Sequence, residues 1–248
     1  MSLARSDPPT IAAIAIAAMC IVTADHEAIG HGAACISQGG HINLVTSVYF
    51  DCSVKRGIVA AGGPIGNLIG AFIAWLLFQM TPARLARLRL LLLLITSFGM
   101  FWEAGYLLKA MIAANGDSFF AMRGLFGQPD TWWRAVGVVF GLALYLLGIR
   151  VTLGSAQGLA PSVLRTAWIA AAIAAALATL AYAPGRVEAL QQAALEIGAA
   201  SIPLLFISWR LADRASTAAW QITRSVGWIA GCAILYIGFI ATLGHGIT

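Results

Sequence analysis

Charged residues are scarce throughout this chain. Asp, Glu, Lys and Arg together make up 10% of its 248 residues, whereas 60% of the residues are hydrophobic. A soluble domain carries about 25% charged residues, which keep its surface compatible with water. The scarcity therefore excludes a water-soluble globular domain and indicates a protein embedded in a lipid bilayer.

Two further absences narrow the fold and the partners. The apolar stretches lack the alternation over ~10 residues that is typical of membrane barrel strands. We therefore expect helices, which pair their own backbone groups inside a membrane. The chain also lacks a basic run: its net charge of +5 comes from residues scattered near the ends of the apolar stretches. Anionic lipid head groups are sufficient partners for such residues, so we expect the lipid bilayer and no nucleic acid as a partner.

Cysteine is rare as well. The four cysteines, Cys20, Cys35, Cys52 and Cys232, are too few and too dispersed for a disulfide scaffold. Cys35 and Cys52 flank a loop and could pair if that loop faces an oxidising compartment. Isolated cysteines in apolar surroundings usually act as small packing residues, and we expect that role for both.

The chain is rich in long apolar runs. A hydrocarbon core of ~30 Å requires ~20 apolar residues per helix. Runs of this kind lie at about 10–35, 57–80, 88–113, 133–154, 164–183, 193–209 and 226–246. They predict an all-α polytopic transmembrane bundle of six or seven spans, in a single integral membrane domain over residues 1–248. Pro203 lies in the short sixth run and predicts a kinked or partly re-entrant span there.

The basic residues also predict an orientation. Nine of the 15 Lys and Arg residues fall on the side of the membrane that holds the N-terminus, and six on the other. Because cytoplasmic loops carry the excess of Lys and Arg, we expect a cytoplasmic N-terminus. The end of the first span then faces outward.

The first span contains a cluster of ionisable residues. Asp25, His26, Glu27 and His31 lie within seven positions of an otherwise apolar helix. Each ionisable group in a span costs ~2.5–3.5 kcal/mol on insertion scales, so such residues are candidates for function. A divalent metal would compensate for imidazoles and carboxylates together. The alternative is a hydrogen-bonded network or a proton relay without metal.

The spacing of the two histidines requires an irregular helix. A metallopeptidase His-Glu-x-x-His motif places two imidazoles four residues apart on one helix face, with Glu as the general base. Residues 26–31 read His-Glu-Ala-Ile-Gly-His, a spacing of five. Five residues rotate a regular helix by about 140° relative to the start, so we expect a π-bulge to realign the rings. The segment resembles the His-Glu-x-x-Gly-His motif of dipeptidyl peptidase III, a zinc peptidase.

Two later segments offer partners for this motif. The second span begins with a Gly-rich stretch that includes Gly63 and carries Asn67, an amide that lipid would not favour. The third span contains Glu103 and is followed by Asp117. Asp117 and the histidines reach the same side of the membrane. Glu103 lies about 21 Å further back at 1.5 Å per residue, so we expect Asp117 rather than Glu103 to be the third ligand.

Residues 20–125 together resemble the site-2 protease family of intramembrane zinc metallopeptidases, and more narrowly a bacterial branch with the lengthened motif. The resemblance implies zinc bound by His26, His31 and Asp117, Glu27 as the general base, and Asn67 holding the substrate or the oxyanion. It also implies a transmembrane or membrane-adjacent peptide as substrate and the bacterial inner membrane as location. Two departures are the extra residue in the motif and the sequence Gly-Asp-Ser at 116–118 in place of Asp-Gly.

A non-catalytic reading stays open beside this one. The chain could be a metal-binding or proton-relaying scaffold, or a transporter-like protein, although no paired halves of a transporter are visible. The family also keeps its zinc nearer the cytoplasm, whereas the charges here place the motif toward the outside. Asp25 is expected either to orient a ligand imidazole or to face another helix. Glu196, near Gln191 and Gln192, is a second carboxylate in a span and is expected to line a water-filled path. The helices over about 133–248 match no family.

Overall fold

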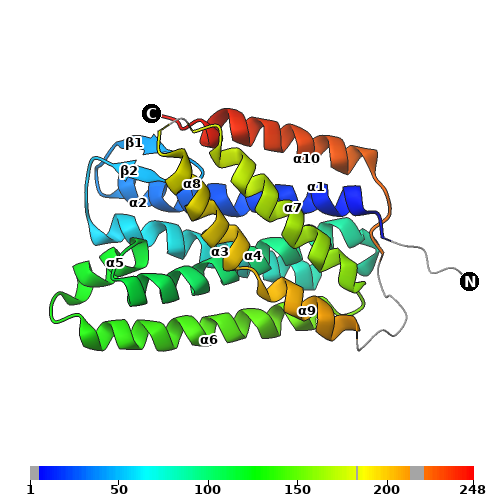
Figure 1. Cartoon of the computed structure of the whole chain (residues 1–248), viewed down its shortest axis with the longest axis horizontal. Coiled ribbons are helices and arrows are strands. Elements are labelled where there is room, and N and C mark those ends of the chain that lie inside the picture. Colours follow the sequence, from blue (N-terminus) through cyan, green and yellow to red (C-terminus); the bar gives the residue numbers. More distant parts are fainter. Residues whose placement is uncertain (1–5, 183, 213–220) are drawn as a thin grey trace, which may run out of the picture.

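The structure is a computed structural model that describes residues 6–182, 184–212 and 221–248 (Figure 1). It is an all-α bundle with one short hairpin, as the composition predicts. The α-helices are α1 (Pro8–Ala24), α2 (Gly32–Ser37), α3 (Gly57–Met80), α4 (Ala86–Ala113), α5 (Asp117–Phe126), α6 (Thr131–Ser155), α7 (Pro161–Thr179), α8 (Arg186–Ala193), α9 (Pro203–Ala212) and α10 (Val226–Phe239). The strands are β1 (Ile42–Val45) and β2 (Phe50–Cys52). Three π-helical segments cover Asp25–His31, Ala194–Ala199 and Ile240–Gly244, and a 3₁₀ turn covers Ala83–Leu85.

Within the described ranges, seven helical stretches are long and apolar enough to cross a membrane, which confirms the expected bundle. They are Pro8–Ser37, Gly57–Met80, Ala83–Ala113, Thr131–Ser155, Pro161–Thr179, Arg186–Leu211 and Val226–Gly244. The sixth stretch is interrupted by the π-helical segment Ala194–Ala199 and by a turn before Pro203. Proline is well suited to the first turn of a helix, so the break predicted at Pro203 is where α9 begins.

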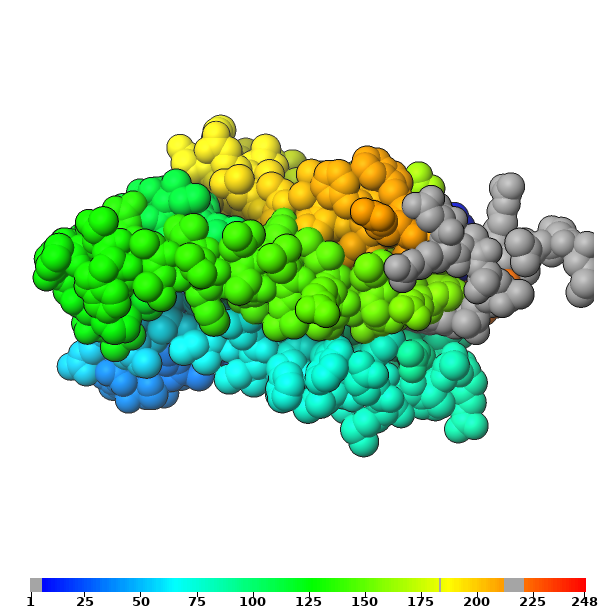
Figure 2. Space-filling model, turned by 90° about the horizontal axis from the view of Figure 1, so that it is seen from below, coloured from blue at the N-terminus to red at the C-terminus, as the bar shows by residue number. Residues whose placement is uncertain are grey.

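The first and third spans form the centre of the bundle. α1 packs against α4, α7 and α10, and α4 also packs against α3 and α6. Ile14 of α1 and Leu94 and Phe98 of α4 are fully buried. In contrast, α3, α6 and α10 expose large apolar side chains such as Phe72, Phe140 and Ile234 on their outer faces. Figure 2 shows α6 lying across one face of the molecule, between α3 and the α8–α9 segment. These exposed apolar faces suit contact with lipid.

The hairpin closes one end of the bundle. β1 and β2 are antiparallel, and the Thr46 hydroxyl accepts a hydrogen bond from the Tyr49 backbone N–H in the connecting turn. Val45 also exchanges two backbone hydrogen bonds with Ile247, which ties the hairpin to the chain after α10. The hairpin therefore has a fixed position beside α2 and the π-helical segment Asp25–His31.

The expectation of unpaired cysteines in this region is wrong. Cys35 at the end of α2 and Cys52 at the end of β2 form a disulfide, and their Cα atoms lie 6.0 Å apart. The hairpin folds back on α2 and brings together the two ends of the loop between Cys35 and Cys52. The apolar surroundings of the two cysteines in the sequence do not indicate this contact. Cys20 and Cys232 are buried free thiols that fill space in the bundle.

A sharp reversal follows α4. Ala114 adopts a left-handed conformation (φ 54°) that ends the helix, and Gly116 has φ 95°, which favours glycine. A Cβ at Gly116 would also lie 2.9 Å from the Tyr106 hydroxyl. After the reversal, α5 runs back along α3. Its first residue, Asp117, is thereby turned toward the first span.

Candidate metal centre

The two motif histidines lie on one side of the first span because the helix widens there. Asp25–His31 is a π-helix, as the spacing of five residues predicts. Each of its i→i+5 hydrogen bonds spans one residue more than the i→i+4 bond of an α-helix. The imidazole centroids of His26 and His31 consequently lie 4.9 Å apart.

Close packing with α3 holds this widened segment. A Cβ at Gly30 would lie 2.5 Å from the Gly62 carbonyl oxygen, and a Cβ at Gly63 would lie 2.6 Å from His26 Nε2. Glycines at these positions let the two backbones approach, as small residues do between membrane helices. Gly63 also leaves the space in front of the imidazole nitrogens free.

Asp117 completes a group that could hold a metal ion, as predicted. Its Oδ2 atom lies 3.5 Å from His31 Nε2 and 3.8 Å from His26 Nε2. The three ligand atoms all lie within 4.8 Å of one another, the one such group of three found in the described residues. Ligand atoms about 2.1 Å from a tetrahedral zinc ion are themselves about 3.4 Å apart. The donor set suits a divalent metal ion, and the two distances to Asp117 are close to this spacing, whereas the widest separation in the group exceeds it.

The hydrogen bonds of the imidazoles leave both Nε2 atoms free to bind a metal. His31 Nδ1 lies 2.7 Å from the Val59 carbonyl oxygen, which can only accept, so Nδ1 carries the proton. His26 Nδ1 donates in the same way to Glu103 Oε1 at 2.8 Å. Such partners set the tautomer and orientation of metal-binding histidines. His26 also stacks on Trp102, and His31 stacks on Phe50.

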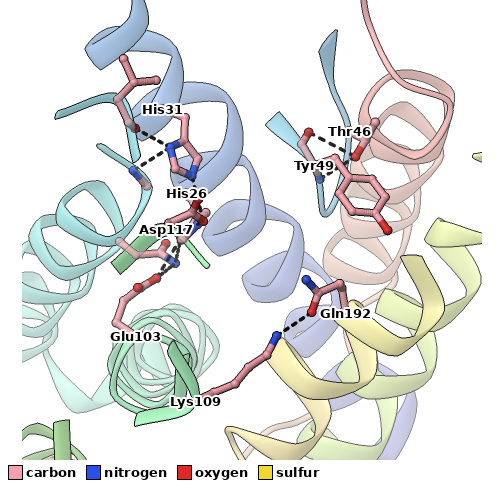
Figure 3. A network of polar contacts seen from close by, with 11 residues as sticks. His26, His31, Thr46, Tyr49, Glu103, Lys109, Asp117 and Gln192 are labelled. Carbon is pink, nitrogen blue, oxygen red and sulfur yellow. Dashed lines mark hydrogen bonds and ion pairs between the residues drawn. The ribbon is translucent and has the colours of Figure 1, made fainter. Parts of the chain in front are cut away.

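Glu103 is much closer to the motif than the estimate along a straight helix indicates. It contacts Nδ1 of His26, whereas Asp117 faces Nε2 of the same ring. The value of about 21 Å is the separation of Glu103 from Asp117 along a straight helix. It is too large because the reversal at 114–116 returns Asp117 toward the middle of the third span. Since Glu103 contacts the nitrogen that does not face the proposed metal, the geometry favours Asp117 as the third ligand. Figure 3 shows His26, Asp117 and Glu103 close together.

Asn67 lies behind His26. Its side-chain amide donates to Glu103 Oε1 at 2.8 Å, and the residue is 1% exposed. It does not belong to the described residues that line the neighbouring cavity. This position favours a role in holding Glu103 and His26 over the predicted contact with substrate or oxyanion.

Glu27 lies beside the three candidate ligands. The residue is 4% exposed, and no hydrogen bond to its carboxylate is found among the described residues. Together with His31 and Asp117 it lines a cavity of about 530 Å³. Its carboxylate is thus available to a molecule in the cavity, as a general base requires.

The other acids of the motif region have different surroundings. Asp25 is half-buried and its carboxylate packs against Gly70 of α3, so the orienting role falls to Glu103. Burial alone would raise the pKa of the Asp117 carboxyl, but the adjacent His26 and His31 outweigh it and hold that pKa below its ordinary value. Asp117 is therefore an anionic ligand candidate at neutral pH.

The cavity contains residues that the sequence reasoning did not place in the site. Tyr106 and Phe50 contribute aromatic walls, and Glu196 from the sixth span reaches the same space. Exposed Lys55, Arg56 and Arg123 lie at its edge. Of these, Glu196 carried a signal in the sequence as a carboxylate within a span, whereas Tyr106 and Phe50 resembled ordinary apolar packing.

Comparison of the chain with models of known protein families, with curated protein sequences and with solved structures finds no match. The geometry of the site is therefore the basis for inferring a function.

Proposed function

We propose that the chain is an intramembrane zinc metallopeptidase that hydrolyses membrane-embedded or membrane-adjacent peptides. One observation carries the proposal. The Nε2 atoms of His26 and His31 and the carboxylate of Asp117 face a common point, and Glu27 lies next to it on the wall of a cavity. Three protein ligands and a nearby carboxylate are the requirements of a catalytic zinc site.

In this proposal, His26, His31 and Asp117 hold the zinc ion. When bound, zinc supplies Lewis acidity that polarises a peptide carbonyl and acidifies water. The Glu27 carboxylate accepts a proton from the attacking water and returns it to the leaving amine nitrogen. Glu103 and Asn67 keep the His26 ring in position, because they fix its Nδ1 atom.

The disulfide supports an outward placement of the site. Cys35–Cys52 closes the loop at the end of the bundle that holds the metal ligands. Disulfides persist in oxidising compartments such as the bacterial periplasm. The excess of basic residues on the N-terminal side leads to the same arrangement. We therefore infer an integral protein of a bacterial inner membrane with a cytoplasmic N-terminus.

The experiment compares cleavage by the wild type with that by Glu27→Gln in proteoliposomes. A pool of single-span peptides is added, and the products are identified by mass spectrometry. We expect the loss of the general base to lower the cleavage rate by about 10²–10⁴-fold while the metal content is kept. Glu188→Gln is the matched control, since Glu188 is exposed in the first turn of α8.

The outcomes separate the peptidase from a non-catalytic protein. Cleavage by Glu27→Gln at the wild-type rate would remove Glu27 from the mechanism. If the wild type holds one metal ion per chain and cleaves none of the peptides, a metal-binding scaffold becomes the better reading. Metal content is measured by elemental analysis, with His31→Ala as the variant that should lose the ion.

A further inference from the structure

Glu196 is a carboxylate within a span that the proposed mechanism does not use. It belongs to the π-helical segment Ala194–Ala199, which interrupts the sixth span, and it is 5% exposed. Its side chain lines the cavity that also contains Glu27, His31 and Asp117. A second cavity of about 230 Å³, which Tyr106 also lines, meets the first at Glu196. The π-helical segments Asp25–His31 and Ala194–Ala199 thus place Glu27 and Glu196 in the wall of the same cavity.

No cation of the described residues forms a close ion pair with Glu196. The nearby Lys109 directs its amine to the Gln192 side-chain oxygen at 2.9 Å (Figure 3). The same amine lies over the Tyr106 ring. No ion pair within 4.0 Å joins Lys109 or any other described Lys, Arg or His to Glu196. A buried carboxylate is stable when it is hydrogen-bonded or paired with a charge. Without such a partner a buried carboxyl takes up a proton instead, so a cationic ligand at the free face of Glu196 would complete the pair and keep the carboxylate charged.

The charges around the cavity favour a cationic group at this position. A divalent ion would offset two of the three nearby carboxylates, Asp117, Glu27 and Glu103, so the site has no positive charge left for Glu196. The exposed cations at the edge, Lys55, Arg56 and Arg123, attract anions instead. The inner wall at Glu196 is therefore the part of the cavity that suits a positive group. Such a group in a membrane span needs a compensating partner.

We propose that Glu196 forms a subsite that binds a protonated amine of the peptide substrate. The amine belongs either to a lysine side chain or to a free amino terminus, since both present an ammonium group. This inference rests on the proposed function only in taking a peptide as the ligand, because the ammonium–carboxylate pair does not depend on hydrolysis. Glu196 is a specificity residue and takes no part in proton transfer.

The test measures binding of fluorescent peptides to full-length protein in nanodiscs, with Glu27→Gln as the background so that the peptides stay intact. One pair of peptides differs by Lys against norleucine, and another by a free against an acetylated amino terminus. A charge-assisted hydrogen bond is stronger than one between neutral groups, so we expect the charged member of one pair to bind at least about tenfold more tightly. The pair that shows the difference identifies the source of the amine.

Glu196→Gln should abolish this preference and leave the affinity for the neutral peptides unchanged. Glu196→Asp, which keeps the charge, should retain the preference and provides a second test if the Gln variant is unstable. Equal binding of charged and neutral peptides to the parent protein, or an equal loss for all peptides in Glu196→Gln, would overturn the proposal. A preference without any cleavage by the wild type would keep the subsite and reject the peptidase. Cleavage by the wild type without a preference for charged peptides would keep the peptidase and reject the subsite.

Discussion

At the scale of single residues, the site depends on which imidazole nitrogen carries the proton. His26 and His31 each donate a hydrogen from Nδ1, one to Glu103 and the other to the Val59 carbonyl. Both Nε2 lone pairs are therefore directed to the point that Asp117 also faces. A neutral imidazole has one donor and one acceptor nitrogen. The partners on Nδ1 thus decide whether a metal can bind at Nε2.

This dependence makes Glu103→Gln an informative substitution. The variant keeps the shape of the side chain but replaces the carboxylate that orients the His26 ring. We expect metal affinity to fall by about 10–100-fold, the usual effect of losing a partner of a metal-binding histidine. The measurement is a zinc titration against a competing chelator. Asp25→Asn, an equivalent change beside Gly70, should leave the affinity unchanged, and an unchanged affinity in Glu103→Gln would contradict the orienting role.

At the scale of elements, the close contact of the π-helix with α3 keeps the site open. Gly30 and Gly62 bring the two backbones together, and Gly63 faces the imidazole of His26. An added methyl group here would occupy the space in front of Nε2. The glycines of α3 therefore affect metal binding as well as helix packing.

Gly63→Ala should accordingly reduce metal binding. The added Cβ would lie 2.6 Å from His26 Nε2, so the ring or the helix has to shift. We expect at least about a tenfold loss of zinc affinity, similar to the loss of an orienting partner. Gly154→Ala in α6 is the matched control, since no atom lies within 4 Å of its added Cβ. Equal zinc affinity in the two variants would show that Gly63 serves packing alone.

The length of the motif offers a test of the π-helix itself. Deleting Ala28 would leave His-Glu-Ile-Gly-His, in which the imidazoles are four residues apart and share one face of a regular helix. We expect this variant to bind zinc, because an α-helical turn holds one residue fewer than the π-helical turn it replaces. Inserting an alanine after Ala28 should abolish binding, since six residues rotate the rings apart. Zinc content per chain distinguishes the two results, and binding by the insertion variant would contradict the argument.

At the scale of the whole molecule, the sequence predicted what depends on local spacing and span length. The all-α bundle, the π-helix at Asp25–His31 and the approach of Asp117 to the histidines all followed from such reasoning. The sequence predicted that Asp117 reaches the histidines, but not the other contacts that chain reversals create. The turn after α4 made the predicted distance from Glu103 to Asp117 too large. The folding of the hairpin onto α2 brings Cys35 and Cys52 together as a disulfide. Tyr106 was missed because an aromatic residue in a span usually packs against its neighbours.

The placement of the whole bundle in the membrane gives a last prediction. The basic residues and the disulfide both favour an outward site, so alkaline phosphatase fused after Gln128, beyond α5, should be active. A green fluorescent protein fused after Gln157, beyond α6, should fluoresce, because that position lies at the opposite end of the bundle. The disulfide should also protect Cys35 and Cys52 from maleimide in intact cells until a reductant is added. The reversed fusion pattern would place the metal ligands toward the cytoplasm, where a reducing environment would leave both thiols free to react.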